Sequence, residues 1–286
     1  MIYVSSACLR ANKISDVIEE YARNGIKYIE LSGGTRFYPE LEQDLIHLKK
    51  KYELEYACHA YFPPPQKDFV VNLASCNDEI YSMSVKHYEK CIQMLRRMGI
   101  HTLSIHAGFQ IEIQPNEIGK DLNDVFVYDR ANSYERFFKA YRRLDQLCAD
   151  NHINFYLENN VLSRKNYENF GKRNYLMMTD SDSIECVEKQ LKFDFLLDLA
   201  HLYVSSNSLN LDYDDECSKL FLKAKWIHLS ENNGIVDEHL PLKEKSDIWK
   251  QFLKRYRGDV NITLETNGNM DDVMLSIDQL KKLGIH

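Results

Sequence analysis

The sequence is poor in glycine and proline, with 11 and 6 among its 286 residues. This scarcity excludes collagen-like repeats and argues against long disordered stretches. Long apolar runs are also missing, since no segment reaches the roughly 18 consecutive apolar residues that a membrane-spanning helix requires. Residues 1–6 do not form a charged leader followed by an apolar stretch. We therefore expect a soluble protein without a membrane partner.

No two of the seven cysteines form a Cys-x-x-Cys pair, and their number is odd. They are scattered at positions 8, 58, 76, 91, 148, 186 and 217. Such a set fits reduced thiols in a cytosol better than a disulfide framework. We therefore expect a cytoplasmic location.

The chain also lacks an excess of positive charge. It has 36 Lys and Arg against 43 Asp and Glu, which gives a formal net charge of −7. Proteins that bind nucleic acid usually carry a basic patch or stripe, because contacts with phosphate supply much of their affinity. The acidic balance therefore disfavours nucleic acid as a partner. It does not exclude one, because an acidic protein can still carry a local basic patch.

What the sequence does have is a regular alternation of short β-rich runs and longer helical patterns. The runs predict eight strands, at 2–5, 27–31, 54–59, 102–106, 154–158, 193–198, 225–229 and 261–265. The patterns that follow them predict eight helices, at 15–24, 40–51, 77–98, 134–150, 183–191, 214–223, 246–256 and 270–283. Strict alternation favours parallel strands with right-handed crossovers, and eight such units predict an α/β protein with a (β/α)8 (TIM) barrel.

No linker or low-complexity tract divides the chain. We therefore expect residues 1–286 to form a single barrel domain, because barrels of this length commonly do. Three predicted strand-to-helix connections are long, at 60–76, 107–133 and 159–180. In a barrel such connections lie at the face where the strands end, and active sites lie there too.

The predicted strands end in imidazoles and carboxylates. The residues at or near these ends are His59, His106, Glu158, Asp198, His228 and Glu265, and His201, Asp237 and His239 follow in the adjacent segments. At one barrel mouth such groups would repel one another or stay desolvated unless a cation lay between them. A divalent metal supplies that charge, and mixed nitrogen and oxygen ligands suit Zn, Mn, Fe, Co or Ni.

Any one of these histidines alone is more often a hydrogen-bonded core residue, and it is their shared position that favours a metal site. The spacing supports this hypothesis. Asp198-x-x-His201 lets two ligands leave one strand end in nearby directions. Asp237-x-His239 has a period of two, so in an extended segment both side chains face one side.

Weaker signals follow the second and third predicted strands. The segment Gly33-Gly34-Thr35-Arg36 either cradles a phosphate or forms a plain turn. Tyr61 begins an aromatic and proline-rich stretch, 61–65, which either walls a sugar or base or forms a rigid surface loop.

Several short motifs occur in one order along nearly the whole chain. They are His59-Ala60-Tyr61, Asn72-Leu73-Ala74-Ser75, Ile105-His106-Ala107-Gly108, Leu157-Glu158-Asn159-Asn160, Leu197-Asp198-Leu199-Ala200-His201, His228-Leu229-Ser230-Glu231-Asn232-Asn233, Asp237-Glu238-His239 and Leu264-Glu265-Thr266. With these spacings the chain resembles the xylose isomerase-like barrel superfamily. That superfamily contains sugar and sugar-phosphate isomerases and epimerases beside endonuclease IV-type nucleases for apurinic sites (AP endonuclease family 2).

The resemblance implies two different uses of the same residues. In the isomerase and epimerase branch, one divalent ion is held at the positions of Glu158, Asp198, His228 and Glu265. There the two glutamates also move protons, and the position of His201 contacts substrate. In the nuclease branch three zinc ions are held, and the further ligand positions are those of His59, His106, His201, Asp237 and His239. All nine residue types are present here, but all nine also occur in sugar-isomerase-like relatives.

Details between these positions depart from the nuclease pattern. A proline-rich insertion separates His59 from Asn72-Leu73, and Leu199-Ala200 replaces Thr-Cys after Asp198. The segment 240–243 replaces the Leu-Gly-x-Gly of the nucleases. His228-Leu-Ser-Glu-Asn-Asn is closer to the epimerase-like branch, although the arginine that this branch often carries a few residues later is absent.

The resemblance therefore favours a metal-dependent isomerase or epimerase of a sugar or sugar phosphate. One to three divalent ions, of Zn, Mn, Co or Mg, would stabilise an enediolate, with Glu158, Glu265 and His201 as catalytic residues. The candidate substrate contacts are Tyr61, His106, Asn160 and Arg36. The alternatives are a multi-zinc phosphodiesterase of the endonuclease IV type, or another metal-dependent lyase or hydrolase on the same scaffold. Whether the chain forms a homo-oligomer stays open.

Overall fold

The computed structural model describes residues 1–123, 125–258 and 260–285. Eight parallel strands form a closed barrel in chain order, and the last strand pairs with the first. The strands are β1 (Ile2–Ser5), β2 (Tyr28–Leu31), β3 (Glu55–His59), β4 (Thr102–His106), β5 (Asn154–Glu158), β6 (Asp194–Asp198), β7 (Ala224–Leu229) and β8 (Asn261–Leu264). The predicted (β/α)8 barrel is confirmed. Asp124, in the predicted loop 107–133, lies outside the described residues. So do Asp259 and His286 of the predicted domain 1–286.

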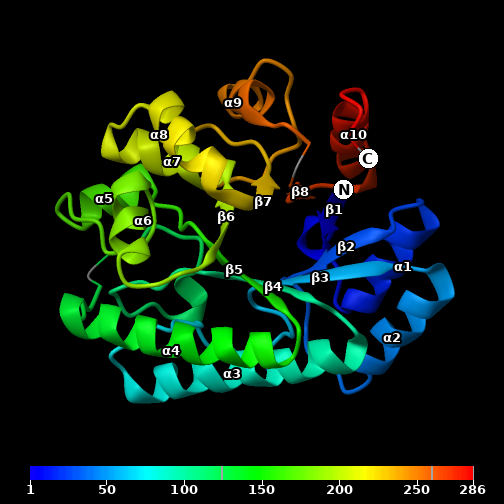
Figure 1. Ribbon diagram of the computed structural model, residues 1–286, viewed down its shortest axis with the longest axis horizontal. Coiled ribbons are helices and arrows are strands. Elements are labelled where there is room, and N and C mark those ends of the chain that lie inside the picture. The colour runs from blue at the N-terminus through cyan, green and yellow to red at the C-terminus, as the bar shows by residue number, and fades with distance from the viewer. Residues whose placement is uncertain (124, 259, 286) are drawn as a thin grey trace.

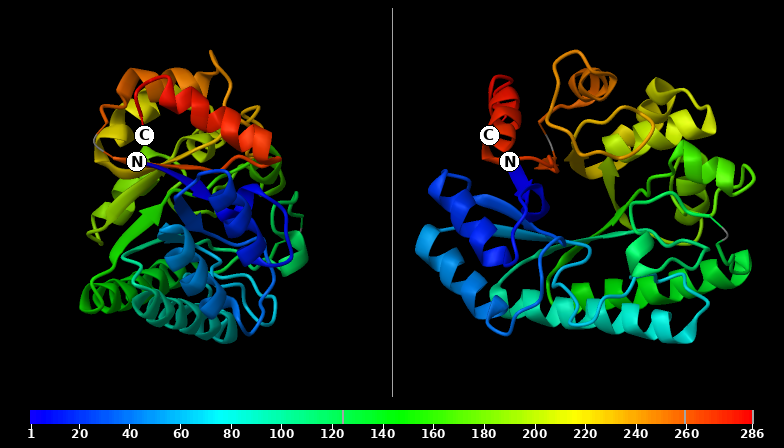
Figure 2. Two further views of the ribbon diagram at one scale, coloured as in Figure 1. Left: turned by 90° about the vertical axis from the view of Figure 1, so that its right-hand side faces the viewer. Right: turned by 180° about the vertical axis from the view of Figure 1, so that it is seen from behind.

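Helices surround the barrel (Figure 1). They are α1 (Ile14–Arg23), α2 (Leu41–Tyr52), α3 (Asp78–Met98), α4 (Arg130–Asp150), α5 (Arg164–Asn169), α6 (Ser181–Glu188), α7 (Leu199–Leu209), α8 (Tyr213–Leu220), α9 (Asp247–Arg255) and α10 (Met270–Lys281). Short 3-10 turns cover Ser6–Cys8, Pro115–Glu117 and Phe221–Lys223. The long helices α3 and α4 lie side by side along one side of the barrel (Figures 1 and 2). None of the helices in the described residues could cross a membrane, because each is too short or too polar.

Two of these helices were not predicted, α5 and α7. The first is a six-residue turn of helix inside the predicted loop 159–180. The second is buried on most of its sides, and even Ser205, Ser206 and Ser208 are inaccessible. Sequence periodicity detects a helix by its contrast between a polar and an apolar face, so a helix that is buried nearly all round gives little signal.

The barrel interior changes from apolar to polar along the strands. At the lower level Tyr3, Ala57, Leu196 and Trp226 form a packed cluster inside the barrel, and Tyr28 and Tyr156 pack against it. Side chains two positions apart on a strand face the same side. The residues two positions further along β3, β5, β6 and β7 are His59, Glu158, Asp198 and His228. This cluster therefore fills the barrel below its mouth. The two-residue period of the strands places the ionisable side chains one layer above it, at the mouth.

Gly108, which follows β4, is closely packed against neighbouring residues beside the barrel mouth. A Cβ added there would lie 2.5 Å from the Cβ of Ala74 and 3.2 Å from Cδ2 of Phe137. We expect Gly108→Ala to lower the free energy of unfolding by about 1–3 kcal/mol through overpacking. Because Ala74 supplies the nearest atom, adding Ala74→Gly should restore space, and the double variant should lose less stability than the two single variants together. Urea unfolding of the four proteins measures this, and strictly additive losses would contradict it.

Candidate metal centre

Four side chains from successive strands meet at the barrel mouth. Glu158, Asp198, His228 and Glu265 each offer a ligand atom, and these atoms lie within 4.8 Å of one another. Nδ1 of His228 is 3.5 Å from Oε1 of Glu158 and 3.4 Å from Oε2 of Glu265. The structure therefore brings together the four positions that the sequence predicted as ligands of one divalent ion.

Two further groups flank these four residues. In the first, Oε2 of Glu158 is 3.3 Å from Nε2 of His59 and 3.4 Å from Nδ1 of His106. In the second, Oδ2 of Asp237 is 3.2 Å from Nε2 of His201 and 2.9 Å from Nε2 of His239. Glu158 belongs to both the central group and the first flanking group. All nine predicted ligand positions are thus within one connected cluster.

Buried polar atoms in this cluster have no hydrogen-bond partner within the described residues. They include both carboxylate oxygens of Glu158, Oδ2 of Asp198, Oδ1 of Asp237, Nδ1 of His239 and Nδ1 of His228. Buried polar groups in folded proteins are nearly always satisfied, and an exception needs an explanation such as a bound ion. The orphaned atoms are oxygen and imidazole nitrogen donors, the set that a Zn-type or Mn-type divalent ion takes. The residues present therefore fit a metal.

The electrostatics of the cluster are those of charges held in a dry site. Burial alone would raise the pKa of Glu158, but the nearby rings of His106 and His59 outweigh it and lower the pKa to about 2. Burial raises the pKa of Asp198 to about 7, and neighbouring carboxylates add to this effect. A cation bound between them would favour the charged form of both carboxylates.

Each of three histidines has one ring nitrogen next to a group of the chain, and the other faces the cluster. Nδ1 of His59 is hydrogen-bonded to Oγ of Ser104 at 2.9 Å, and Nδ1 of His201 to the carbonyl oxygen of Asn159 at 3.0 Å. Nε2 of His228 lies 3.0 Å from Oε1 of Glu30. Such outer partners fix the tautomer and the orientation of a metal-binding imidazole.

Sequence reasoning missed these outer partners. Glu30 carried a detectable signal, because it is a lone carboxylate in the apolar run of β2, and it is 1% exposed. The Asn159 side chain makes two hydrogen bonds to the backbone of Asp198. Its Oδ1 accepts from the Asp198 N–H at 2.8 Å, and its Nδ2 donates to the Asp198 carbonyl at 3.0 Å. Nothing in the spacing of Ser104 or Asn159 distinguishes them from ordinary strand-end polar residues.

Asp198 also explains why the chain turns here into a helix. Its Oδ1 accepts a hydrogen bond from the backbone N–H of His201 at 2.6 Å, which caps the N-terminus of α7. Aspartate is among the best residues at this position because it satisfies a free helical N–H. The Asp-x-x-His spacing therefore begins a helix whose first turn directs His201 back over the strand end.

The loop that carries Asp237 and His239 is held rigidly. Backbone hydrogen bonds of 2.9 and 2.7 Å join Glu231 and Leu240 across its base. Gly234 has a φ of +73° and packs so closely on Asn207 that a Cβ would lie 2.2 Å from Nδ2. The expectation of an extended Asp237-x-His239 segment was wrong in one respect, because His239 has a left-handed φ of 50°. This kink turns its ring to Asp237.

Above the cluster lies a cavity of about 1040 Å³. Its walls include parts of the connections after β3, β4 and β5, which are the three long loops predicted from the sequence. Glu265, His201, Asp237, His239, His59 and His106 reach the cavity surface. Glu158, Asp198 and His228 are 0% exposed and lie within the barrel mouth below.

The predicted substrate contacts differ in their placement. His106 and Tyr61 line the cavity, and Tyr61 packs against Gly33, where an added Cβ would lie 2.9 Å from the Tyr61 Cβ. Asn160 also lines it, but its amide nitrogen already lies within hydrogen-bonding distance of the carbonyls of Ala107, Gly108 and Met177. It therefore ties neighbouring loops together. Gly33, Gly34 and Thr35 line the cavity, whereas Arg36 is exposed and is not part of the lining. The choice between a turn and a phosphate cradle at 33–36 stays a prediction.

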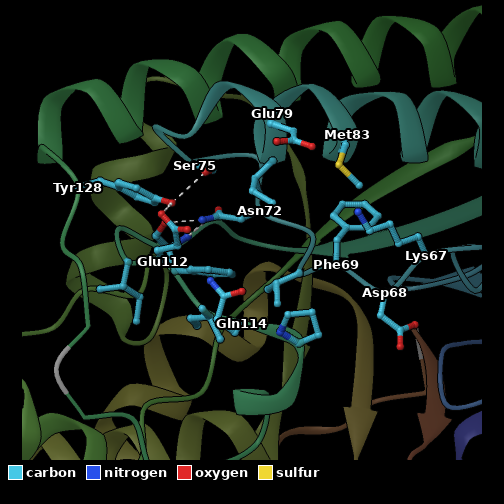
Figure 3. A pocket seen from close by; sticks show the side chains of 16 residues that line it. Lys67, Asp68, Phe69, Asn72, Ser75, Glu79, Met83, Glu112, Gln114 and Tyr128 are labelled. Carbon is cyan, nitrogen blue, oxygen red and sulfur yellow. Dashed lines mark hydrogen bonds between the residues drawn. The ribbon is translucent and has the colours of Figure 1, made fainter.

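A smaller cavity of about 240 Å³ adjoins the main one and shares the wall formed by Phe69, Asn72 and Phe109 (Figure 3). On its far side Ser75 donates to the Tyr128 hydroxyl at 3.1 Å, which donates to Glu112 at 3.2 Å. Among its described residues, none of the buried side-chain polar atoms lacks a partner. The unsatisfied atoms of the metal cluster therefore lie at or below the main cavity, and none of the described residues around the smaller one contributes to them.

Known proteins are similar to the chain over nearly its full length. The profile of the xylose isomerase-like TIM barrel family matches residues 18–283. The uncharacterised protein MJ1614 of Methanocaldococcus jannaschii is 24% identical over 273 residues, which covers 94% of this chain and 93% of that protein. A D-tagatose 3-epimerase-like protein superposes with a TM-score of 0.71 at 19% identity, over 98% of this chain and 96% of the other. Endonuclease IV of Thermus thermophilus superposes with a TM-score of 0.61 at 13% identity, over 98% and 97%. At 19% and 13% identity, these two superpositions show that the chain shares its fold with the epimerase-like protein and with endonuclease IV.

Metal binding is tested by the substitution Asp198→Asn. Zn²⁺ at a hundred times its dissociation constant should stabilise the chelator-stripped wild-type protein by about 2.7 kcal/mol per site. Asp198→Asn should remove at least half of the Zn²⁺-induced rise in Tm, because it replaces a charged ligand. Asp194→Asn, at the exposed start of the same strand, is the matched control and should respond as the wild type does. An undiminished rise in the Asp198 variant would contradict the assignment.

Proposed function

Because this chain belongs to the xylose isomerase-like TIM barrel family, we propose that it is a metal-dependent isomerase or epimerase of a sugar. The observation that carries the proposal is the approach of two carboxylates to one imidazole at the base of a large cavity. Glu158 from β5 and Glu265, directly after β8, reach Nδ1 of His228 from different sides of the barrel. Such an arrangement suits removal of a proton from a carbon next to a carbonyl and its return at another position or face.

Glu158, Asp198, His228 and Glu265 would hold the divalent ion. When bound, this ion would supply Lewis acidity toward a carbonyl and an adjacent hydroxyl oxygen. Glu265 is the proton-transfer group that reaches the cavity, and its pKa is lowered by the neighbouring His228 ring despite burial. It is therefore ionised and able to accept a proton. Glu158 is the second such group, and His201 and His106 orient substrate hydroxyls.

The charges of the residues that line the cavity favour a small, uncharged substrate. Its described lining contains two cationic residues other than histidine, Arg10 and Lys120. Against these stand the carboxylates of Asp68, Glu117, Asp121, Asp237 and Glu265. A phosphate group is usually held by several Arg or Lys side chains or by a helix N-terminus, and a nucleic-acid groove by a basic rim. A free sugar or a glycoside is therefore favoured over a sugar phosphate and over DNA.

The proposed reaction predicts exchange of a carbon-bound hydrogen with solvent. Metal-loaded protein incubated with a panel of ketoses and aldoses in D2O should place deuterium next to the carbonyl of its substrate, as read by NMR. Glu265→Gln should lower this rate by about 10²–10⁴-fold, because the variant cannot accept the proton. Glu117→Gln, which alters a lining carboxylate outside the metal cluster, is the control and should stay near the wild-type rate. Full exchange by the Glu265 variant would exclude its proposed role.

A second candidate function is hydrolysis of a phosphate ester by several metal ions. It is favoured by the two flanking groups, since an isomerase of the proposed kind needs only the central four residues. With ions in all three groups, the bridging position of Glu158 would suit a site that activates water and holds phosphate oxygens together.

Metal counting separates the two candidates. If the chain is a sugar isomerase, elemental analysis of protein purified without chelator should give about one ion per chain, and Asp237→Ala or His239→Ala should leave that number unchanged. Two or three ions that fall in number in these variants would favour the hydrolase. Cleavage of bis(p-nitrophenyl) phosphate, with the deuterium assay as its counterpart, checks the same choice by activity.

A further inference from the structure

One buried carboxylate beside the metal cluster, Glu30, is not among the nine predicted ligand positions. Glu30 lies on β2 with 1% of its surface exposed, and its side chain contacts groups from β7 and β8. Burying a carboxylate is costly unless it is paired and hydrogen-bonded. The partners of Glu30 therefore indicate what it does.

Glu30 receives contacts at both oxygens. Oε2 accepts a hydrogen bond from the Thr263 hydroxyl at 3.2 Å, and that hydroxyl oxygen accepts one from Nε1 of Trp226 at 2.8 Å. Oε1 lies 3.0 Å from Nε2 of His228. A relay of buried side chains thus fixes one oxygen of the carboxylate, which leaves the other oxygen at a defined place beside the histidine.

The two nitrogens of His228 face different surroundings. Nε2 faces Glu30, whereas Nδ1 faces Glu158 and Glu265. A carboxylate beside Nε2 favours the tautomer that carries its proton there, which frees the lone pair of Nδ1 for the cluster. Nδ1 of His59 and of His201 is hydrogen-bonded to a neutral group, a hydroxyl and a carbonyl, although Nδ1 of His201 also lies 3.4 Å from Oε1 of Glu158. Nε2 of His228 instead faces a carboxylate that lies outside the nine predicted ligand positions.

We propose that Glu30 is a positioning residue for the metal centre, which accepts the Nε2 proton of His228, aims Nδ1 at the bound ion and strengthens it as a donor. This inference rests on the proposed metal ligation by His228. It does not depend on which reaction the site performs. Glu30 also lies near enough to His59 and His228 to act as a ligand itself, and the experiment distinguishes that role by stoichiometry.

The experiment titrates chelator-stripped protein with Co²⁺ and follows its visible d–d absorption. Glu30→Gln keeps the size and a hydrogen-bond acceptor but removes the charge, and Glu30→Ala removes both. We expect the dissociation constant to rise about tenfold in the first and toward a hundredfold in the second, with an altered spectrum and an unchanged number of ions. Ser104→Ala removes the neutral partner of His59 and should cost less. Glu55→Gln, at the exposed start of β3, should change nothing.

A readout without metal separates positioning from simple structural support. The Tm of the stripped Glu30→Gln protein should stay near that of the wild type, because the amide oxygen keeps an acceptor for Nε2 of His228 and no buried polar group is left unpaired. Unchanged Co²⁺ affinity in both variants would overturn the proposal, as would a lowered Tm that accounts for the whole loss. Loss of one ion per chain would overturn it in favour of direct ligation. Since no substrate is involved, failure of the proposed isomerase activity would leave these results unaffected.

Discussion

A carboxylate that is fully buried and has no hydrogen bond imposes the main constraint on this molecule. Glu158 is 0% exposed, and neither of its oxygens has a hydrogen-bond partner within the described residues. In a site of low dielectric such a charge is stable only beside positive charge. The surrounding histidines supply part of this, and a divalent ion would supply the rest. The nine cluster residues, the closed floor of packed side chains below them and the outer partners of the imidazoles together surround this charge in the barrel mouth.

Much of this arrangement could be predicted from the sequence. Eight apolar runs separated by helical patterns indicate a barrel, and the barrel itself determines that residues at the strand ends meet. That geometric rule is why Glu158 and Asp198 could be grouped although they lie 40 positions apart in the sequence. Asp198 gives a further local signal, because an aspartate three residues before His201 caps the helix that follows the strand. The fold is confirmed, and the structure brings these side chains together, because a local pattern or the geometry of a closed barrel determines each position.

The parts that were missed depend on contacts between distant segments. Helix α7 is buried nearly all round, so its sequence carries no amphipathic period. Glu30 is separated from His228 by almost the whole barrel in sequence, and only closure of the barrel makes them neighbours. The kink at His239 arises because the loop is tied at Glu231 and Leu240, which a two-residue spacing cannot reveal. The close approach of Tyr61 to Gly33 is another contact between distant segments that the glycine pair in the sequence does not reveal.

The proposed metal centre is tested most directly by locating a bound metal ion in the crystal. Crystals soaked in MnCl2 or ZnCl2, with data collected on both sides of the metal absorption edge, would show each ion as an anomalous peak. We predict a peak between Glu158, Asp198, His228 and Glu265, with Nδ1 of His228 as its ligand and Nε2 still facing Glu30. Absence of a peak between these four residues at saturating metal, with ions bound elsewhere or nowhere, would contradict it.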